Sequence, residues 1–280
     1  MIRRLAAAAP ADRAWQRARH ATRRWALWGA AVGLALGLLL AAPASWLASV
    51  VQQASGERLL LADARGSVWQ GNALLVLTGG PGSRDASALP GRMYWRLRPD
   101  WRGLKLRLEH PCCINGKLML KLQPAWSGFR LELPPQNQAI GHWPARWLSG
   151  LGTPWNTLQL GGSLQLSSPG FSLEQVAGRT RIEGALSLQV LGLSSRLSPL
   201  DTLGSYRLAI AADPAAGQTA QLTLDTLDGA LRLSGTGQWS GSRLRFRGQA
   251  EAAAGQESAL ANLLNLLGRR QGALAVISIG

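Results

Sequence analysis

Cysteine is nearly absent from this sequence of 280 residues, because it occurs only at the adjacent positions Cys112 and Cys113. Adjacent cysteines can close only a strained two-residue ring, so they cannot supply the long-loop cross-links that stabilise small exported domains. They also lack the spaced ligand pairs of zinc sites, although His110 stands just before them. We therefore expect a vicinal disulfide or two packed thiols, and no metal site.

Catalytic motifs are missing as well. The sequence contains no G-x-S-x-G, no HExxH and no glycine-rich phosphate loop before a helix, and it has three histidines in all. An enzyme needs converging polar groups that activate a nucleophile, a metal or a proton donor. We therefore expect no catalytic residue and no cofactor, and we interpret the protein as a binding or scaffolding module.

Acidic residues and lysines are scarce relative to arginine. Fifteen acids stand against 30 basic residues, and the formal net charge is +15. A basic surface could meet nucleic acid, anionic lipid headgroups or an acidic protein face, or it could only keep the domain soluble. Nucleic acid is disfavoured as a partner, because the sequence also predicts that most of the chain leaves the cytoplasm.

That prediction rests on residues 25–47, a long apolar stretch within a region that has no charged residue between Arg24 and Glu57. A bilayer core about 30 Å thick needs roughly 20 mainly apolar helical residues, which this stretch provides. Tryptophans suited to the two membrane interfaces stand near its ends, at Trp25, Trp28 and Trp46. The stretch is therefore predicted to be a transmembrane helix.

The tail before this stretch, residues 1–24, contains seven arginines and one acid. Positive charge holds a flank in the cytoplasm, so residues 48–280 are expected on the far side of the membrane. A cleaved secretory signal would have the same arrangement, with residues 42–44 as its exit site. The long basic tail and the long apolar run favour a retained, single-pass anchor.

Alternation with a period of two dominates the exported part. Residues 104–109, for example, alternate leucine with a charged side chain, which is the pattern of a half-buried strand. Most connections contain Gly, Pro, Asn or Asp and are too short for a crossover helix, which predicts an antiparallel meander. Strands are predicted around residues 93–98, 104–109, 118–122, 129–133, 158–166, 206–210, 222–224, 231–233 and 244–246.

Connections between these strands fall into three kinds. Residues 79–91 and 134–144 are predicted to be longer loops. Short turns are expected at residues 99–100, 115–116, 213–214 and 228–229. The pattern Trp-x-Gly precedes a strand at Trp69, Trp101, Trp126 and Trp239. In that pattern we expect the tryptophan to cover a sheet end and the glycine to allow a turn or bulge.

Helical spacing returns near the C-terminus. Across residues 256–267 leucines fall at i, i+3, i+4 and i+7, Gly268 stands at the expected end, and residues 273–279 form a predicted last strand. The fold class is therefore mainly β: one transmembrane helix, then a curved antiparallel meander of half-barrel or taco-like form with a short C-terminal helix and final strand.

Five segments of the chain together resemble the type II secretion system protein N family, also called general secretion pathway protein N. They are AAPASWLASVV at 41–51, GSVWQGNA at 66–73, GTPWNTLQLGG at 152–162, GTGQWSGSRLRFRGQAEA at 235–252 and ESALANLLNLLGRRQGALAVISIG at 257–280. The resemblance implies a single-pass protein of the inner membrane with a large periplasmic domain and no catalytic residues. Its implied partners are the inner-membrane platform proteins and the outer-membrane secretin.

Two hypotheses about function follow. The leading one is scaffolding within the secretion machinery, with a sheet edge at residues 241–248 or 273–279 as the docking site. The alternative is lipid binding or transfer, because the family is distantly similar to AsmA-like proteins with a hydrophobic groove. A leucine face that is not a closed core could hold phospholipid acyl chains. The candidate docking or groove residues are Leu160, Leu231, Arg243, Leu244, Arg245, Phe246 and Arg247.

Overall fold

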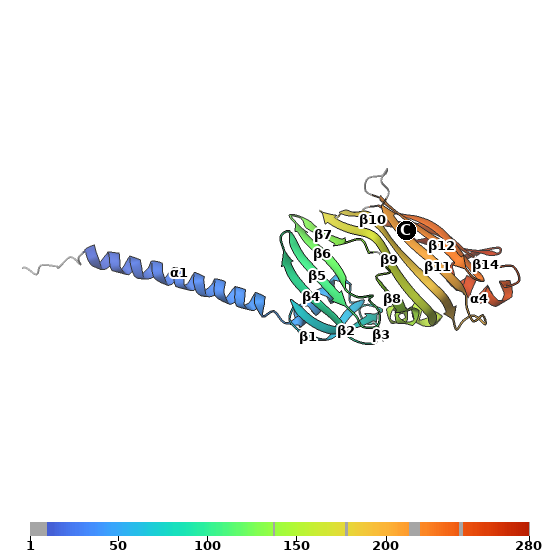
Figure 1. Cartoon of the computed structure of the whole chain (residues 1–280), viewed down its shortest axis with the longest axis horizontal. Coiled ribbons are helices and arrows are strands. Elements are labelled where there is room, and N and C mark those ends of the chain that lie inside the picture. The colour runs from blue at the N-terminus through green and yellow to red at the C-terminus, as the bar shows by residue number, and fades with distance from the viewer. Residues whose placement is uncertain (1–9, 137, 177–178, 213–218, 241–242, 280) are drawn as a thin grey trace, which may run out of the picture. The chain divides into compact units, whose positions relative to one another are not determined.

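The computed structural model describes residues 10–136, 138–176, 179–212, 219–240 and 243–279, with side chains from residue 25 to residue 278 within these ranges. The chain divides into two compact units, Met1–Pro43 and Ala44–Gly280, which are treated separately below. Helix α1 lies in the first unit, and a large sheet with four short helices forms the second (Figure 1).

Helix α1, Pro10–Leu40, begins inside the predicted basic tail and ends before the predicted end of the apolar segment. All its described side chains, from Trp25 to Leu40, are exposed. Within the part of the chain that the structure describes, no helix is both long enough and apolar enough to cross a membrane.

Residues 44–47, predicted to end the membrane segment, instead begin a second helix, α2, Ala44–Ala54. Proline lacks a backbone N–H and disfavours helical geometry in the residue before it, so Pro43 separates the two helices. Ala44 is 1% exposed and packs with Trp95 of the sheet, and Leu47 lies against the same cluster. The predicted helix boundary at residue 47 was therefore wrong.

The second unit contains a single antiparallel sheet of 16 strands among the described residues. The order is β1-β2-β4-β5-β6-β7-β9-β10-β11-β12-β13-β14-β16-β15, which follows the chain as far as β14 and then places β16 before β15, while β3 pairs with β2 and β8 with β9. The end strands β1 and β15 do not pair with each other, so the sheet is open. The strands are β1 Leu59–Gly66, β2 Gln70–Thr78, β3 Ala86–Ala88, β4 Met93–Asp100, β5 Gly103–Glu109, β6 Leu118–Ala125, β7 Gly128–Leu133, β8 Gly141–Pro144, β9 Leu160–Val176, β10 Arg179–Ser195, β11 Gly204–Ala212, β12 Thr219–Asp228, β13 Leu231–Ser240, β14 Arg243–Ala252, β15 Arg269–Gln271 and β16 Leu274–Ile279.

The predicted mainly-β antiparallel meander is confirmed, with differences in detail. Leu158 lies in a short helix, α3, Trp155–Leu158, and the predicted loops at 79–91 and 134–144 contain the short strands β3 and β8. The strand expected after Trp69 is β2, whereas β1, β10 and the short β15 were missed. In β1 and β10 the pairing register shifts at bulges, which break the alternation that marks a strand in sequence. The predicted turn at 213–214 lies outside the described residues.

Two hydrophobic clusters hold the sheet. The first lies beneath helix α4, Glu257–Leu267, whose Leu260, Leu263 and Leu264 are at most 2% exposed. The second lies beneath α2 and includes Trp95. Full burial of a leucine side chain contributes about 1.5–3 kcal/mol, so α4 holds the C-terminal half of the sheet chiefly through these three residues.

Candidate functional site

The predicted docking segment lies on β14, where its side chains alternate between two faces. Arg243, Arg245 and Arg247 are exposed, whereas Leu244 is half-buried and Phe246 is 7% exposed. One side of β14 pairs with β13 along its whole length. On the other side β16 pairs only from Phe246 onward, so residues 243–245 have no strand beside them there among the described residues.

The last strand, β16, leaves a similar gap. Strand β15 covers only Leu274, Ala275 and Val276 of its outer side, so residues 277–279 have no described strand beside them there. We call residues 243–245 and 277–279 together the stepped edge. Unpaired backbone N–H and C=O groups at such an edge can accept another strand.

The other two predicted site residues, Leu160 and Leu231, are not part of a groove. They are 8% and 2% exposed and belong to the cluster that also contains Leu260, Leu263 and Leu264 of α4. Helix α4 lies against β14, β15 and β16 and contributes three of the buried residues of this cluster. Leu160 and Leu231 are therefore part of a buried core and do not line an open groove.

Cys112 and Cys113 are bonded to each other, with their Cα atoms 3.7 Å apart. They lie in the connection between β5 and β6, and Cys113 is 1% exposed. A ring nitrogen of His110 and the two sulfur atoms lie within 4.8 Å of one another. A sulfur atom in a disulfide is not a thiolate, which is the form of cysteine that binds metals, so the trio in this state is not a built metal site.

The inner face of the first half of the sheet lines a partly open apolar cavity of about 470 Å³. Helix α2 and the 3₁₀ helix η1, Ala145–Leu151, contribute to its walls, as does Trp143 of β8. Strands β1 to β7 must curve to surround one cavity. It is lined by Leu47, Val51, Leu59, Leu61, Val68, Leu75, Leu89, Met93, Trp95, Leu97, Leu106, Leu108, His110, Ile114, Leu118, Leu122, Leu131, Trp143 and Trp147.

His110 is the exception in this apolar lining. It is 3% exposed, its Nδ1 accepts a hydrogen bond of 3.3 Å from the backbone N–H of Cys112, and its Nε2 has no partner among the residues that the structure describes. Burial lowers the pKa of the imidazole. In the sequence, His110 drew attention only as a possible metal ligand. Alternation shows which residues face inward, but it does not show that a cavity remains between them.

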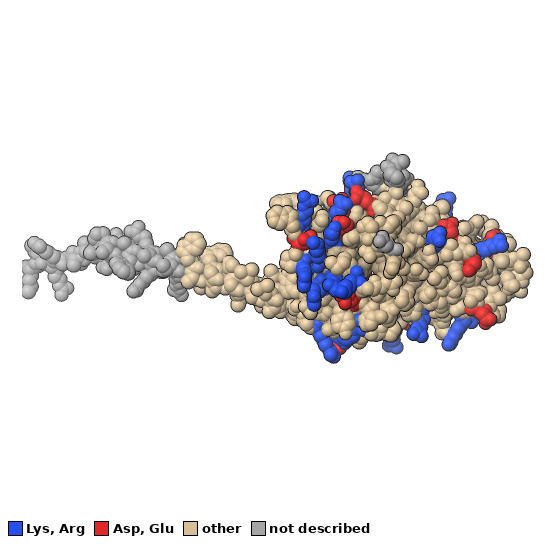
Figure 2. All heavy atoms as spheres, viewed as in Figure 1, with Lys and Arg blue, Asp and Glu red and all other residues tan. Residues whose placement is uncertain are grey.

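The outer face of β4, β5 and β6 is basic, as Figure 2 shows for the region of these strands. Three pairs of like charges stand directly opposite each other across neighbouring strands: Arg96 with Arg107, Arg98 with Lys105, and Lys105 with Lys121. Like charges in this position destabilise a sheet. Arg107, Lys105 and Lys121 have acidic partners, whereas Arg96 and Arg98 have none among the described residues.

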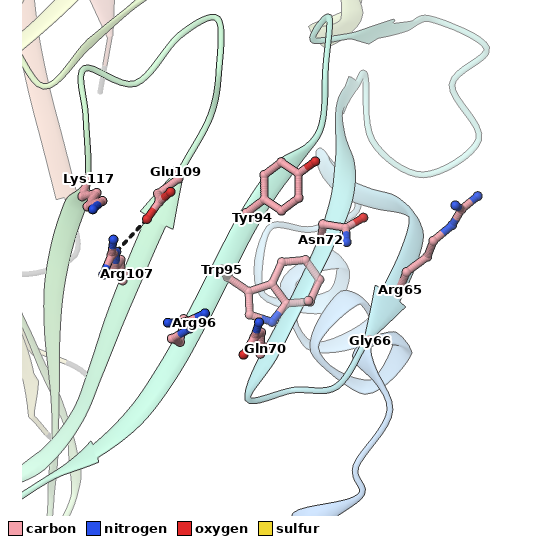
Figure 3. Close-up of a pocket in the computed structure, with 11 residues that line it drawn as sticks. Arg65, Gly66, Gln70, Asn72, Tyr94, Trp95, Arg96, Arg107, Glu109 and Lys117 are labelled. Atoms are coloured by element: carbon pink, nitrogen blue, oxygen red, sulfur yellow. Dashed lines mark hydrogen bonds and ion pairs between the residues drawn. The ribbon is translucent and has the colours of Figure 1, made fainter.

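A shallow hollow of about 520 Å³ lies on this outer face, at its border with β2 (Figure 3). Arg96, Arg107 and Lys117 project into it from neighbouring segments, and Glu109 pairs with Arg107 at 2.7 Å. We call the outer surface of β4 to β6, including this hollow, the basic face. Its excess of positive charge suits an acidic partner surface.

The Trp-x-Gly tryptophans do not all cover the sheet. Trp101 and Trp126, at the tips of the β4–β5 and β6–β7 hairpins, are 95% and 107% exposed. The expectation that they cover a sheet end was wrong for these two residues. Each lies in a two-residue turn beyond the last paired residues, so its ring has no neighbouring strand to pack on.

Comparison with known proteins gives one match. The family model described as type II secretion system (T2SS), protein N, matches residues 57–276, which is well over half of the chain. No curated protein and no solved structure matches the chain. The matched range covers every strand except the last three residues of β16, and with them the basic face, residues 243–245 of the stepped edge and all of the cavity lining except Leu47 and Val51.

Proposed function

Because the chain belongs to the type II secretion system protein N family, we propose that it is an accessory component that links other proteins of the type II secretion machinery. The family match is the observation that carries this function, and it involves the chain in type II secretion. The linking role is our further step. It is supported by two separate surfaces suited to protein contacts, the stepped edge and the basic face.

In this proposal the apolar segment that starts at Trp25 anchors the protein in the inner membrane as far as Pro43, residues 1–24 remain in the cytoplasm and residues 44–280 occupy the periplasm. The apolar side chains exposed along α1 and the arginines of the tail support this arrangement. Protease added to spheroplasts should then degrade residues 44–280. Protection of that part until the inner membrane is broken would contradict the topology.

A linking protein needs at least two contact surfaces that different partners can occupy at once. The stepped edge offers backbone hydrogen bonds to an added strand, flanked by Arg243 and Arg245. The basic face lies on the other half of the sheet, on β4 to β6. We assign these surfaces to the two expected classes of partner, the inner-membrane platform proteins and the outer-membrane secretin.

Site-specific crosslinking tests the stepped edge. Arg243→Cys and Ser278→Cys, made in a Cys112→Ser/Cys113→Ser background, should each give a specific crosslink to a secretin or platform protein in intact cells. Thr236→Cys is the matched control, because Thr236 is exposed on the interior strand β13, which is paired on both sides. Intact secretion without any crosslink at the edge positions would remove this edge as a docking site.

Deletion of the gene tests the function as a whole. The role in secretion predicts that folded exoproteins accumulate in the periplasm while the outer membrane stays impermeable to large antibiotics. Lipid transport predicts the reverse, namely continued secretion with a leaking outer membrane. Restoring the gene on a plasmid is the control for effects on neighbouring genes.

The position of α4 argues against the lipid-transfer alternative. A bridge for lipids needs a continuous apolar groove, but the C-terminal half of the sheet is packed against Leu260, Leu263 and Leu264. The partly open cavity in the N-terminal half has the size of a pocket for one small ligand rather than of a channel. The structure thus favours a single binding site over a lipid path.

A further inference from the structure

Four exposed apolar side chains lie at one end of the sheet. Trp101 and Trp126 are almost fully exposed, and Phe129 and Val176 are exposed as well. They belong to the turns or the adjoining strand ends of three hairpins, β4–β5, β6–β7 and β9–β10, which follow one another in the sheet (Figure 1). Exposed apolar residues scattered singly are normal, whereas a group of them at one end indicates a contact surface.

The two tryptophans lie on neighbouring hairpins. Each is in a two-residue turn just beyond the last pair of its hairpin, which is Asp100 with Gly103 in one and Ala125 with Gly128 in the other. Strands β5 and β6 pair with each other, so the two hairpins are adjacent. Neighbouring strands are about 4.8 Å apart, which places the two turns about 10 Å apart across the sheet. Two indole rings therefore project from the end of the sheet close to each other.

Positive charge surrounds these turns. Arg102 lies in the β4–β5 turn and Arg179 at the start of β10, and both are exposed without an ion-pair partner among the described residues. Within two residues of the three turns the only acid is Asp100, which is paired with Lys105 at 2.8 Å. Tryptophan and arginine together suit a bilayer interface, because the indole ring sits at the headgroup level and the guanidinium group binds phosphate.

The second unit receives the chain at this same end. Helix α2 ends beside the start of β1, because Ser55 Oγ hydrogen-bonds with the backbone of Leu59. The helix begins at Ala44 in the cluster of Trp95, whose ring donates to the backbone of the β1–β2 turn. The first residue of α2 therefore lies toward the β1–β2 turn. In an antiparallel sheet of this order, the β4–β5 and β6–β7 turns lie at that end too.

We propose that this end of the sheet docks on the bilayer that anchors the chain, with Trp101 and Trp126 in the interface and Arg102 and Arg179 on the phosphates of anionic phospholipids. The bilayer is a better fit than a protein, because the turns protrude and the anchor that precedes Ala44 holds a membrane within reach. Docking fixes the direction in which the stepped edge faces its partner. This inference rests on the membrane anchor of the proposed function.

A fluorophore beside Trp126 measures docking directly. The full chain with Ser127→Cys, in a Cys112→Ser/Cys113→Ser background, carries a nitrobenzoxadiazole label. It is reconstituted into vesicles of phosphatidylcholine alone, or of phosphatidylcholine and phosphatidylglycerol in equal parts. We expect the label to brighten in the anionic vesicles, to shift to the blue and to be quenched by spin-labelled lipid.

Ser83→Cys is the matched control for the labelled position. Ser83 is also an exposed serine, but it lies in the β2–β3 connection at the opposite end of the sheet. Its label should stay in water in both kinds of vesicle. Circular dichroism checks the fold of every variant. If the two serines at 112 and 113 disturb the fold, the disulfide is kept and the label is attached without reductant.

Removal of one tryptophan tests the contribution of the rings. Trp101→Ser leaves the labelled turn unchanged and should lower the ratio of docked to undocked protein about tenfold, as for the partial burial of one large apolar side chain. Trp155→Ser is its control, because Trp155 is 37% exposed but lies in α3 at the opposite end of the sheet. It should leave the ratio unchanged.

Removal of two charges tests the contribution of the phosphates. Arg102→Gln/Arg179→Gln should lower the same ratio about fivefold per arginine in the anionic vesicles and change nothing in the neutral ones. Arg84→Gln/Arg196→Gln removes two exposed arginines from connections at the opposite end and controls for net charge. An equal effect of the two double variants, or of the two tryptophan variants, would overturn the proposal.

Flotation of the vesicles separates docking from anchoring. A chain that floats with the neutral vesicles is anchored, and docking is overturned if its label at residue 127 is then as exposed to water in the anionic vesicles as the label at residue 83. A chain that does not float with the neutral vesicles contradicts the anchor. Docking then requires flotation with the anionic vesicles that Trp101→Ser weakens, and its absence overturns the proposal. A photocrosslinker at residue 127 that captures a protein and no lipid in intact cells overturns it as well.

Discussion

Nδ1 of His110 accepts the backbone N–H of Cys112 at 3.3 Å, while the other ring nitrogen, Nε2, is buried without a hydrogen-bond partner among the described residues. The same contact is lost when Nδ1 takes up a proton. His110 thus connects two features of the β5–β6 connection, the disulfide segment and the apolar cavity. Its protonation is expected to disturb both.

The stability of the protein should therefore depend on pH through His110. Burial lowers the pKa of this imidazole from its usual value of 6.5, so in mild acid the unfolded chain binds a proton that the folded chain does not. The stability is present in full above the usual pKa and is lost as the pH falls below it. We expect Tm to fall between about pH 7.5 and pH 5.5, and to fall less in His110→Phe. An equal fall in His110→Phe and in the control His142→Phe would contradict this origin.

Helix α4 should stabilise the C-terminal half of the sheet through one face alone. Leu263→Ala removes a side chain that is 2% exposed and should lower the free energy of unfolding by about 2–5 kcal/mol. Leu266→Ala, in the same helix but 49% exposed, should lower it far less. Denaturant titration of both variants measures the difference, and equal losses would show that α4 does not pack as described.

We expect the like-charge pairs of the basic face to serve binding and to lower the stability of the sheet. Arg96→Gln removes one member of the like-charge pair with Arg107 and should raise the free energy of unfolding by about 0.2–1 kcal/mol. The same substitution should reduce co-purification with secretion partners, and Arg98→Gln should act in the same direction. Arg232→Gln on β13, which is exposed outside this face, is the control for a loss of positive charge. A stabilised variant with unchanged co-purification would remove the basic face as a docking surface.

The disulfide should contribute little to stability. Its two residues are adjacent, so bond formation closes almost no loop in the unfolded chain, and the entropic gain of a long-loop disulfide is absent. Thermal melts with and without a phosphine reductant should give nearly the same Tm. The Cys112→Ser/Cys113→Ser variant provides the baseline for effects of the reductant itself, and a fall in Tm confined to the unaltered protein would refute the expectation.

Much of the sheet could be predicted from alternation alone. Residues 104–109 place every leucine on the inner face and every charge on the outer face, and the structure pairs Leu106 with Leu97 and Arg107 with Arg96. Strands with bulges were missed, as in β10, where the register shifts near Ala185 and again near Leu191. Alternation is a local property, and a bulge reverses it within one strand.

The candidate sites were harder to predict from sequence than the sheet, because they depend on long-range packing. Arg243, Arg245 and Arg247 were placed on a strand near the end of the sheet, but only the pairing of β14 with β16 shows that the edge is open at residues 243–245. Leu160 and Leu231 have the same alternating pattern as the leucines that line the cavity. They differ because Leu160 and Leu231 lie in a buried cluster that includes residues of η1, α3 and α4, whereas a cavity remains beside α2.

The sequence by itself determined the mainly-β class, the antiparallel meander, the C-terminal helix and the family, because these follow from local periodicity, turn residues and ordered motifs. Only the tertiary structure decided where the apolar segment breaks, which leucines are enclosed and which nitrogen of His110 stands unpaired. Those features depend on the volume left between elements distant in sequence. Volume is a property of packing, and no local pattern of residues specifies it.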